Sequence, residues 1–350
     1  MTQFAAELPD NSTKQNRPTG WLDGTTFDLT FLVGTVAVAL ASLTIVLARP
    51  SLFRIVLLAD VWLLGYHHVI STYTKLAPDA EARHANRALL TWVPLVVIAS
   101  VALVGYGVGL WALTTIYLYW QWWHYSRQSW GVHRVYQRKG SNLEDDRLSK
   151  AAFYAIPIWG ILHRSAQDPD SFLGVDVEVL PVPSIVAHAV GLVAIGVLAA
   201  HGYRLFAAWR RGDLSIAHAT YLISHNLMFF VGYILIPNID LGWLAINIWH
   251  NAQYIGFVWY FNHRRHASDT GDAGQTSVVA KLSRRRNPLP YLVACFLLSS
   301  VIYLAIDSTI AATVAPIIVY QAINFHHYVV DSLIWKVRKA PLQQTLGISR

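Results

Sequence analysis

The chain has little cysteine and little charge. Its 350 residues contain one cysteine, Cys295, and only 13% of them are Asp, Glu, Lys or Arg, about half of the share that is usual in soluble proteins. A single cysteine excludes an internal disulfide framework. The sequence also contains no flavin, nicotinamide or ferredoxin motif, and its polar first residues include no apolar run that would predict a cleaved signal peptide.

Long apolar stretches dominate the sequence instead. Hydrophobic residues make up 54% of it, and the charged residues cluster between stretches of roughly 20 residues that carry almost none, as in transmembrane helices. The sequence therefore predicts an all-α, polytopic membrane helix bundle with about ten transmembrane helices. The apolar segments are residues 28–48, 51–74, 88–105, 108–128, 151–163, 184–206, 215–236, 241–262, 288–308 and 310–335.

The basic residues predict the orientation of this bundle. If the N-terminus is cytoplasmic and all ten segments span, only Arg49, Arg54 and Arg164 of the 27 Lys and Arg residues lie outside. The positive-inside rule then places both termini in the cytoplasm, and we expect a multi-pass protein of the inner (cytoplasmic) membrane. Because cytoplasmic loops account for the net charge of +7, no nucleic-acid partner is expected.

The domain organisation is simple. We expect a cytoplasmic N-terminal tail over 1–27, one membrane bundle over 28–336 and a cytoplasmic C-terminal tail over 337–350. The segment 151–163 is short and contains Pro157, which kinks helices, so the sequence leaves open whether it spans fully.

Histidines on five of the predicted helices lie at a similar depth, between the middle of the membrane and its cytoplasmic face. Polar groups are costly in hydrocarbon, so these side chains are expected to face the bundle interior and to mark function. Neutral imidazole is the commonest metal ligand in proteins. The predicted metal ligands are His67, His68, His124, His225, His250, His326 and His327.

Carboxylates and a tyrosine accompany these histidines at helical spacing. Asp331 lies four residues after His327, Tyr254 lies four residues after His250, and Asp60 lies two turns before His67. Asp331, Asp60 and Tyr254 are therefore predicted to have catalytic or ligand-orienting roles. A ligand set without thiolates is typical of iron, in a mononuclear or dinuclear site, and also suits zinc, copper or manganese. The alternative is that each histidine only forms hydrogen bonds between helices.

The segment WQWWHYSRQSWG, residues 120–131, is dense in aromatic residues. It can form the wall of a cavity for a lipophilic substrate, or an aromatic belt at the membrane interface. Arg127 within it can pair with an acidic substrate head or with Asp331, or extend to the interface as arginines at helix ends commonly do.

Two motifs carry a family resemblance. HHYVVD contains His326, four intervening residues and Asp331, and HNAQYIGFVW contains His250 followed by FVW, with Tyr254 where a second histidine belongs. Both resemble the bacterial Brp/Blh family of membrane β-carotene 15,15'-dioxygenases, and YHHVIS at 66–71 is loosely similar to an early motif of that family. More broadly, the pattern resembles the histidine-rich membrane iron oxygenases, although HRRH at 263–266 is the nearest match to their histidine boxes. The resemblance implies non-haem iron and O2.

Three functions follow from these observations. The first is a membrane oxygenase that uses iron and O2 on a membrane lipid or other lipophilic small molecule, with electrons from a donor protein if the reaction needs them. The second is a b-type haem electron carrier or sensor, in which paired histidines ligate the haem. The third is a proton-coupled transporter, in which His and Asp side chains relay protons.

Overall fold

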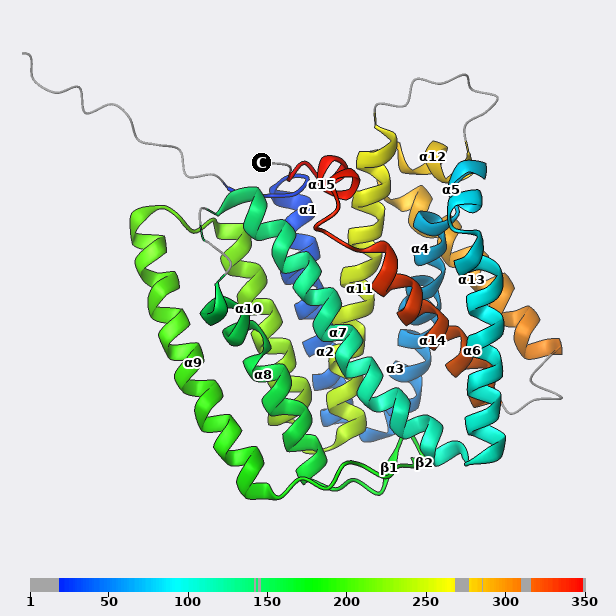
Figure 1. Cartoon of the computed structure of the whole chain (residues 1–350), viewed down its shortest axis with the longest axis horizontal. Helices are drawn as coiled ribbons and strands as arrows, with labels where there is room; N and C mark the ends of the chain where they lie inside the picture. Colours follow the sequence, from blue (N-terminus) through cyan, green and yellow to red (C-terminus); the bar gives the residue numbers. More distant parts are fainter. Residues whose placement is uncertain are drawn as a thin grey trace, which may run out of the picture.

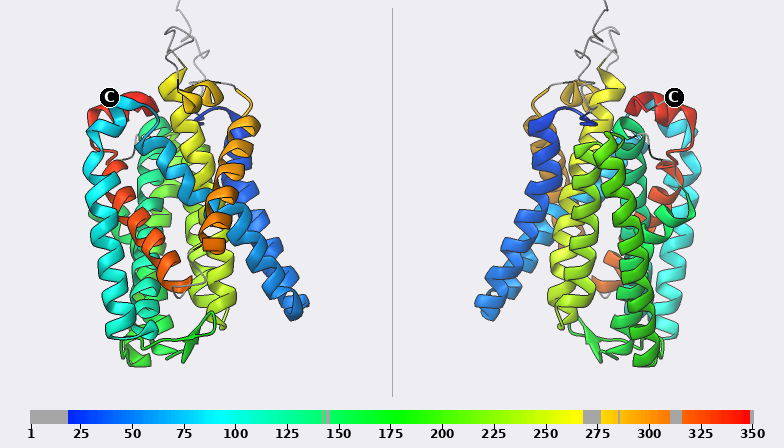
Figure 2. Two further views of the ribbon diagram at one scale, coloured as in Figure 1. Left: turned by 90° about the vertical axis from the view of Figure 1, so that its right-hand side faces the viewer. Right: turned by 90° about the vertical axis from the view of Figure 1, so that its left-hand side faces the viewer.

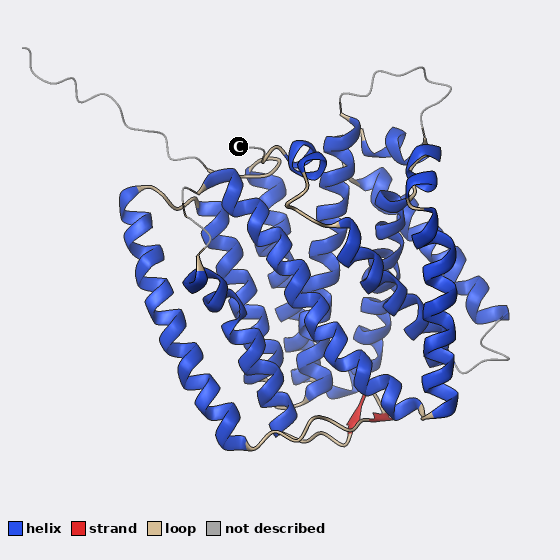
Figure 3. Ribbon diagram, viewed as in Figure 1, coloured by secondary structure: helices blue, strands red, loops and turns tan. Residues whose placement is uncertain are grey.

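The protein is a bundle of long helices in a computed structural model (Figure 1 and Figure 3). The structure describes residues 19–141, 143, 146–267, 277–284, 286–309 and 316–348. The predicted all-α class is confirmed. Within the described residues, the exception is a short antiparallel hairpin of β1 (Ser171–Phe172) and β2 (Val175–Asp176), in which Ser171 pairs with Asp176.

The helices follow the predicted segments closely along the chain. The long ones are α1 (Thr25–Leu29) with η1 (Thr30–Gly34) and α2 (Thr35–Ala48); η2 (Pro50–Leu52) with α3 (Phe53–Asp60), η3 (Val61–Gly65) and α4 (Tyr66–Leu76); α6 (Arg87–Gly107); α7 (Leu110–Gly140); α8 (Arg147–Ala166); α9 (Ser184–Arg211); α10 (Ile216–Phe230) with η4 (Val231–Leu235); α11 (Ile239–His266); α13 (Leu289–Thr309); and α14 (Pro316–Ile334). The short helices are α5 (Ala80–Ala85), α12 (Val278–Ser283) and α15 (Ala340–Leu346).

Several helices have the character of membrane spans. Among the described residues, 5 helical stretches are long and apolar enough to cross a membrane, namely Thr25–Ala48, Pro50–Leu76, Arg87–Gly107, Ser184–Arg211 and Leu289–Ser308. Their apolar side chains point outward to an unusual degree: Leu103 on α6 is 74% exposed and Leu192 on α9 is 73% exposed. Such surfaces are expected of helices that face lipid. The predicted count of about ten spans is not confirmed by length and apolarity.

The more polar helices lie in the interior of the bundle, between these apolar helices. Helix α11 is buried over nearly its whole length and runs through the centre of the bundle, with α14 crossing it obliquely (Figure 1 and Figure 2). Helices α4 and α14 pack against each other. In addition, α4 packs against α11 and α14 packs against α7. Helices α7, α11 and α14 are not among the stretches that are apolar enough to cross a membrane, and each buries polar side chains against other helices.

Local sequence explains the helix ends. Asp146 caps α8 by accepting from the Ser149 backbone N–H at 2.8 Å, and this bond, together with one from Arg204, lowers the pKa of Asp146 to about 2. Asn238 caps α11 through the Leu241 N–H at 3.0 Å. Gly212 ends α9 in the left-handed region, at φ 85°, which favours glycine.

Some boundaries differ from the prediction. Helix α7 continues beyond residue 128 to Gly140, because its C-terminal part packs in the bundle and buries Val135 and Tyr136. Helix α8 spans 20 residues and continues through Pro157. The predicted C-terminal tail contains α15, whose Leu342 is buried. Of the predicted N-terminal tail, residues 1–18 lie outside the described residues.

Candidate metal centre

Three helices bring four metal-ligating side chains to one point. His68 on α4, His124 on α7, and His327 and Asp331 on α14 are all buried, and each offers one ligand atom within 4.8 Å of the others. Ligand atoms on opposite sides of an ion lie about 4.2 Å apart when each bond is about 2.1 Å. The four atoms therefore lie close enough together to share one ion after small shifts.

A π-helical turn decides which residue of the first histidine pair faces the centre. The turn η3 (Val61–Gly65) separates Asp60 from His67 and His68, and a π-turn adds about one residue to a helical turn. The added residue rotates the following helix by about one position. With this shift His68, rather than His67, lies in the group at the centre, and His67 lines a separate cavity.

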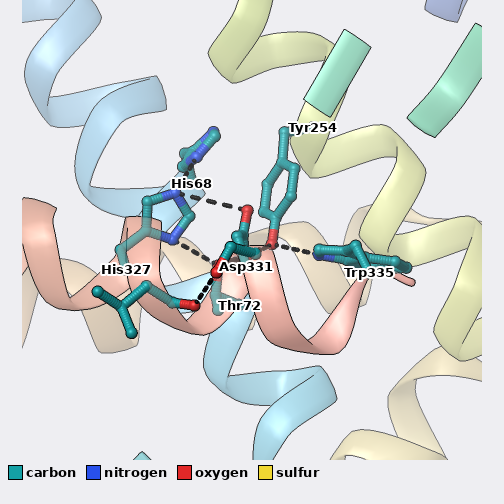
Figure 4. Close-up of polar contacts among 8 residues, drawn as sticks. His68, Thr72, Tyr254, His327, Asp331 and Trp335 are labelled. Atoms are coloured by element: carbon teal, nitrogen blue, oxygen red, sulfur yellow. Dashed lines mark hydrogen bonds and ion pairs between the residues drawn. The ribbon is translucent and has the colours of Figure 1, made fainter. Parts of the chain in front are cut away.

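A hydrogen-bond network fixes His327 and Asp331 (Figure 4). The Thr72 hydroxyl lies 2.9 Å from His327 Nδ1 and 2.7 Å from the Tyr254 hydroxyl, and Tyr254 donates to Asp331 Oδ1 at 2.7 Å. Trp335 Nε1 donates to the Tyr254 hydroxyl at 3.0 Å. In this chain His327 Nδ1 carries a proton and donates it to the Thr72 hydroxyl. The lone pair of His327 Nε2 is then directed into the centre.

Several polar atoms at the centre have no partner. His68 Nδ1, His124 Nε2, His250 Nε2 and Asp331 Oδ2 are buried without a hydrogen bond. Leaving one buried polar atom unsatisfied costs about 1–3 kcal/mol, so a cluster of them is expensive. His68 Nε2 and His327 Nε2 also lie only 2.7 Å apart. A cation held by one nitrogen of each imidazole and by Asp331 would give a partner to several of these atoms, although not to both nitrogens of His68.

Two predicted site residues lie next to the centre but outside the group of four. The His250 ring lies 4.9 Å from that of His68 and 5.3 Å from that of His124. Asp60 accepts from Asn247 Nδ2 at 2.6 Å, and Asn247 in turn accepts from Tyr125. Because the Tyr125 ring packs 4.0 Å from His250, Asp60 belongs to a polar layer behind His250.

The structure does not bring three of the predicted ligands to the centre. His225 bonds Ser129 Oγ at 2.8 Å and the Phe153 carbonyl at 3.0 Å, so both of its nitrogens are engaged. His326 is similarly engaged by the Tyr73 hydroxyl at 2.7 Å and the Leu89 carbonyl at 2.8 Å. His67 lines a separate apolar cavity of about 440 Å³.

The sequence reasoning missed Thr72 and Trp335. Both carry a signal: Thr72 lies four residues after His68, and Trp335 lies four residues after Asp331, so each shares a helix face with a ligand. The Tyr328 ring stacks on that of His124, with ring centroids 4.3 Å apart. Tyr254 stacks on His68 at 4.2 Å, so aromatic rings pack against two of the imidazoles.

A cavity opens directly beside the centre. It has a volume of about 330 Å³, and His124, Tyr254 and Asp331 line its inner end. Trp120, Trp123 and Phe257 contribute apolar walls. A small molecule in this cavity would contact side chains of the candidate centre, which is the arrangement expected of a substrate pocket.

Comparison of the chain with protein-family models, with curated proteins and with solved structures found no match. The chemistry of the candidate centre is therefore argued from its own residues.

Proposed function

We propose that the protein is a membrane-embedded metalloenzyme, a non-haem iron oxygenase that acts on a lipophilic substrate. The observation that carries the proposal is the convergence of His68, His124, His327 and Asp331, with unsatisfied ligand atoms, at the end of a substrate-sized cavity. Iron suits imidazole and carboxylate ligands with positions left open for O2 and substrate. HHYVVD and HNAQYIGFVW resemble motifs of the Brp/Blh dioxygenases, but His326 of the first motif is bonded away from the centre and Tyr254 replaces a histidine of the second, so the ligand set proposed here is not that of the resemblance.

The dimensions of the centre favour an ion over haem. Two axial histidines must lie on opposite faces of a porphyrin, whereas His68 Nε2 and His327 Nε2 are 2.7 Å apart. The Tyr254 and Tyr328 rings occupy the space beside His68 and His124. An ion bound by three imidazoles and one carboxylate needs no such space.

Each residue has a defined task in this proposal. His68, His124, His327 and Asp331 bind the metal, which supplies the activation of O2. Thr72 holds the tautomer of His327, and Tyr254 holds one oxygen of Asp331 so that the other faces the metal. The aromatic and apolar walls of the cavity exclude water from reactive species. His250 is placed to support this site or to bind a second ion.

The membrane topology belongs to the same proposal. All ten long helical segments would span the inner membrane, with the cation-rich loops in the cytoplasm. The described start of the chain at α1 and its last helix α15 lie at the same end of the bundle (Figure 1), as an even number of spans requires. The centre would then lie within the bilayer, and a lipophilic substrate could reach it from there.

Metal analysis and an optical spectrum of the detergent-purified protein test this function. We expect about one iron per chain, no Soret band, and O2 consumption that depends on an added lipophilic substrate. A Soret band would identify a haem protein. A protein that stays free of metal when incubated with Fe²⁺, Zn²⁺, Cu²⁺ or Mn²⁺ would refute the proposal.

A further inference from the structure

The cavity beside the candidate metal centre has a cation at its outer part. Arg127 and Gln128 line it together with Ser332. Arg127 is exposed and lies three residues after His124 on α7, about 4.5 Å further along the helix axis. The lining of the cavity thus includes both candidate ligands, His124 and Asp331, and a guanidinium.

The guanidinium is held in place but is not neutralised. Arg127 Nη1 donates to the Tyr154 hydroxyl at 3.0 Å, and the Trp123 ring lies 5.7 Å from the guanidinium carbon. In the described part of the chain, no carboxylate forms an ion pair with Arg127. Asp331, the acidic residue of this cavity, is bonded to Tyr254 at its inner end. Arginine has five N–H donors in a planar fork, so several remain for a ligand.

The remaining lining fits an apolar body. Trp120, Trp123, Phe257, Tyr328 and Val329 give the cavity a largely apolar lining. A neutral hydrocarbon would leave the N–H donors of Arg127 unused.

We propose that this cavity binds an amphiphilic carboxylate, with its acidic head on Arg127 and its apolar body directed toward the candidate metal centre. This inference rests on the proposed function only in that the occupant would be the substrate. An arginine fork binds a carboxylate through two parallel hydrogen bonds, which fixes the head and thereby the position of the carbon chain relative to the centre. Arg127 would be a specificity-determining residue.

Binding of dodecanoate to the full-length protein in an uncharged detergent tests this. The measurement is quenching of tryptophan fluorescence by 12-bromododecanoate, displaced by dodecanoate or by methyl dodecanoate, because Trp120, Trp123 and Trp335 line the cavity. We expect the acid to displace the probe and the methyl ester to do so roughly ten- to hundredfold less well, the usual cost of losing a hydrogen-bonded charge.

Arg127→Gln should weaken acid binding by a similar roughly ten- to hundredfold, and Arg127→Lys should weaken it less. Arg210→Gln on α9, a basic residue far along the chain from the cavity, is the control and should bind like the parent protein. Equal binding of acid and ester, or acid binding unchanged in Arg127→Gln, would overturn the inference. The second result would leave Arg127 as an interfacial anchor.

The test separates this inference from the proposed function. Metal content is measured on the same samples and should be unchanged in Arg127→Gln, because Arg127 offers no ligand atom. Acid binding that depends on Arg127 in a protein free of metal would support the cavity and refute the metalloenzyme. Bound metal without acid binding would overturn the cavity inference alone.

Discussion

The bundle contains two groups of buried histidines, and α7 contributes to both. His124 belongs to the candidate metal centre, with His68, His327 and Asp331. His133, nine residues further along, belongs to a second histidine group with His218 and His225 on α10. Both groups are buried and both join imidazoles from different helices, so the density of histidine does not distinguish them.

The two groups differ in the partners of their nitrogens. In the second group, His218 bonds Ser141 at 2.9 Å and His133 at 3.3 Å, and His225 bonds Ser129 and a carbonyl. Within that group only His133 Nε2 is buried without a partner, and no carboxylate belongs to it. The candidate metal centre instead leaves atoms of His68, His124 and Asp331 unsatisfied. Unsatisfied atoms that converge, rather than histidines in general, indicate a metal site.

The largest effect is expected when the same substitution, histidine to leucine, is made in each group. His124→Leu should lower metal affinity by about 100-fold or more, since loss of a supporting group alone costs about 10–100-fold. It should leave the stability of the metal-free protein nearly unchanged, because it removes an unsatisfied nitrogen. His225→Leu should keep the metal but lower the free energy of unfolding by about 1–3 kcal/mol, because it leaves buried partners unpaired.

Metal content by mass spectrometry and thermal unfolding with and without a chelator measure both effects. If His225→Leu loses the metal while His124→Leu keeps it, the two groups have been assigned the wrong way round. If both substitutions only destabilise the protein, neither group binds a metal.

The two buried aspartates provide the next contrast. Asp331 keeps one oxygen free beside His327, with Oδ2 3.7 Å from Nε2, whereas Asp60 lies behind His250 and bonds Asn247. Asp331→Asn removes the negative charge of the centre and should weaken metal binding by about 10–100-fold. Asp60→Asn should change it by less than about threefold, as a residue outside the ligand set. Metal titration of the chelator-treated variants measures both affinities. A larger loss in Asp60→Asn than in Asp331→Asn would contradict the assignment of Asp331 to the centre.

Much of the fold follows from the sequence, because long apolar stretches predict helices directly. The spacing of His327 and Asp331 also places them on one helix face, and the structure shows them together at the centre. His326, which is also a predicted ligand, lies about 100° away on the helix and contacts Tyr73 instead.

Two parts of the site could not be predicted in this way. Periodicity gives angles within one helix, but not the rotation that a π-turn introduces, so it could not choose His68 over His67. It also cannot show that His225 finds the Phe153 carbonyl on a neighbouring helix. Whether a buried histidine is satisfied is a property of tertiary packing.

The smallest expected effect comes from removing a single hydroxyl, that of Thr72, with Thr74 as the comparison. Thr72 and Thr74 are neighbours on α4, but Thr72 bonds His327 whereas Thr74 bonds Tyr291 at 2.7 Å. Thr72→Val should lower metal affinity about tenfold, because the His327 ring loses the group that fixes its tautomer, and Thr72→Ser should restore it. Thr74→Val removes a buried hydrogen bond of similar length without touching the centre, so it should affect stability alone. Equal metal affinities for the two valine variants would mean that His327 is not held as a ligand, because a ligating imidazole depends on the partner of its second nitrogen.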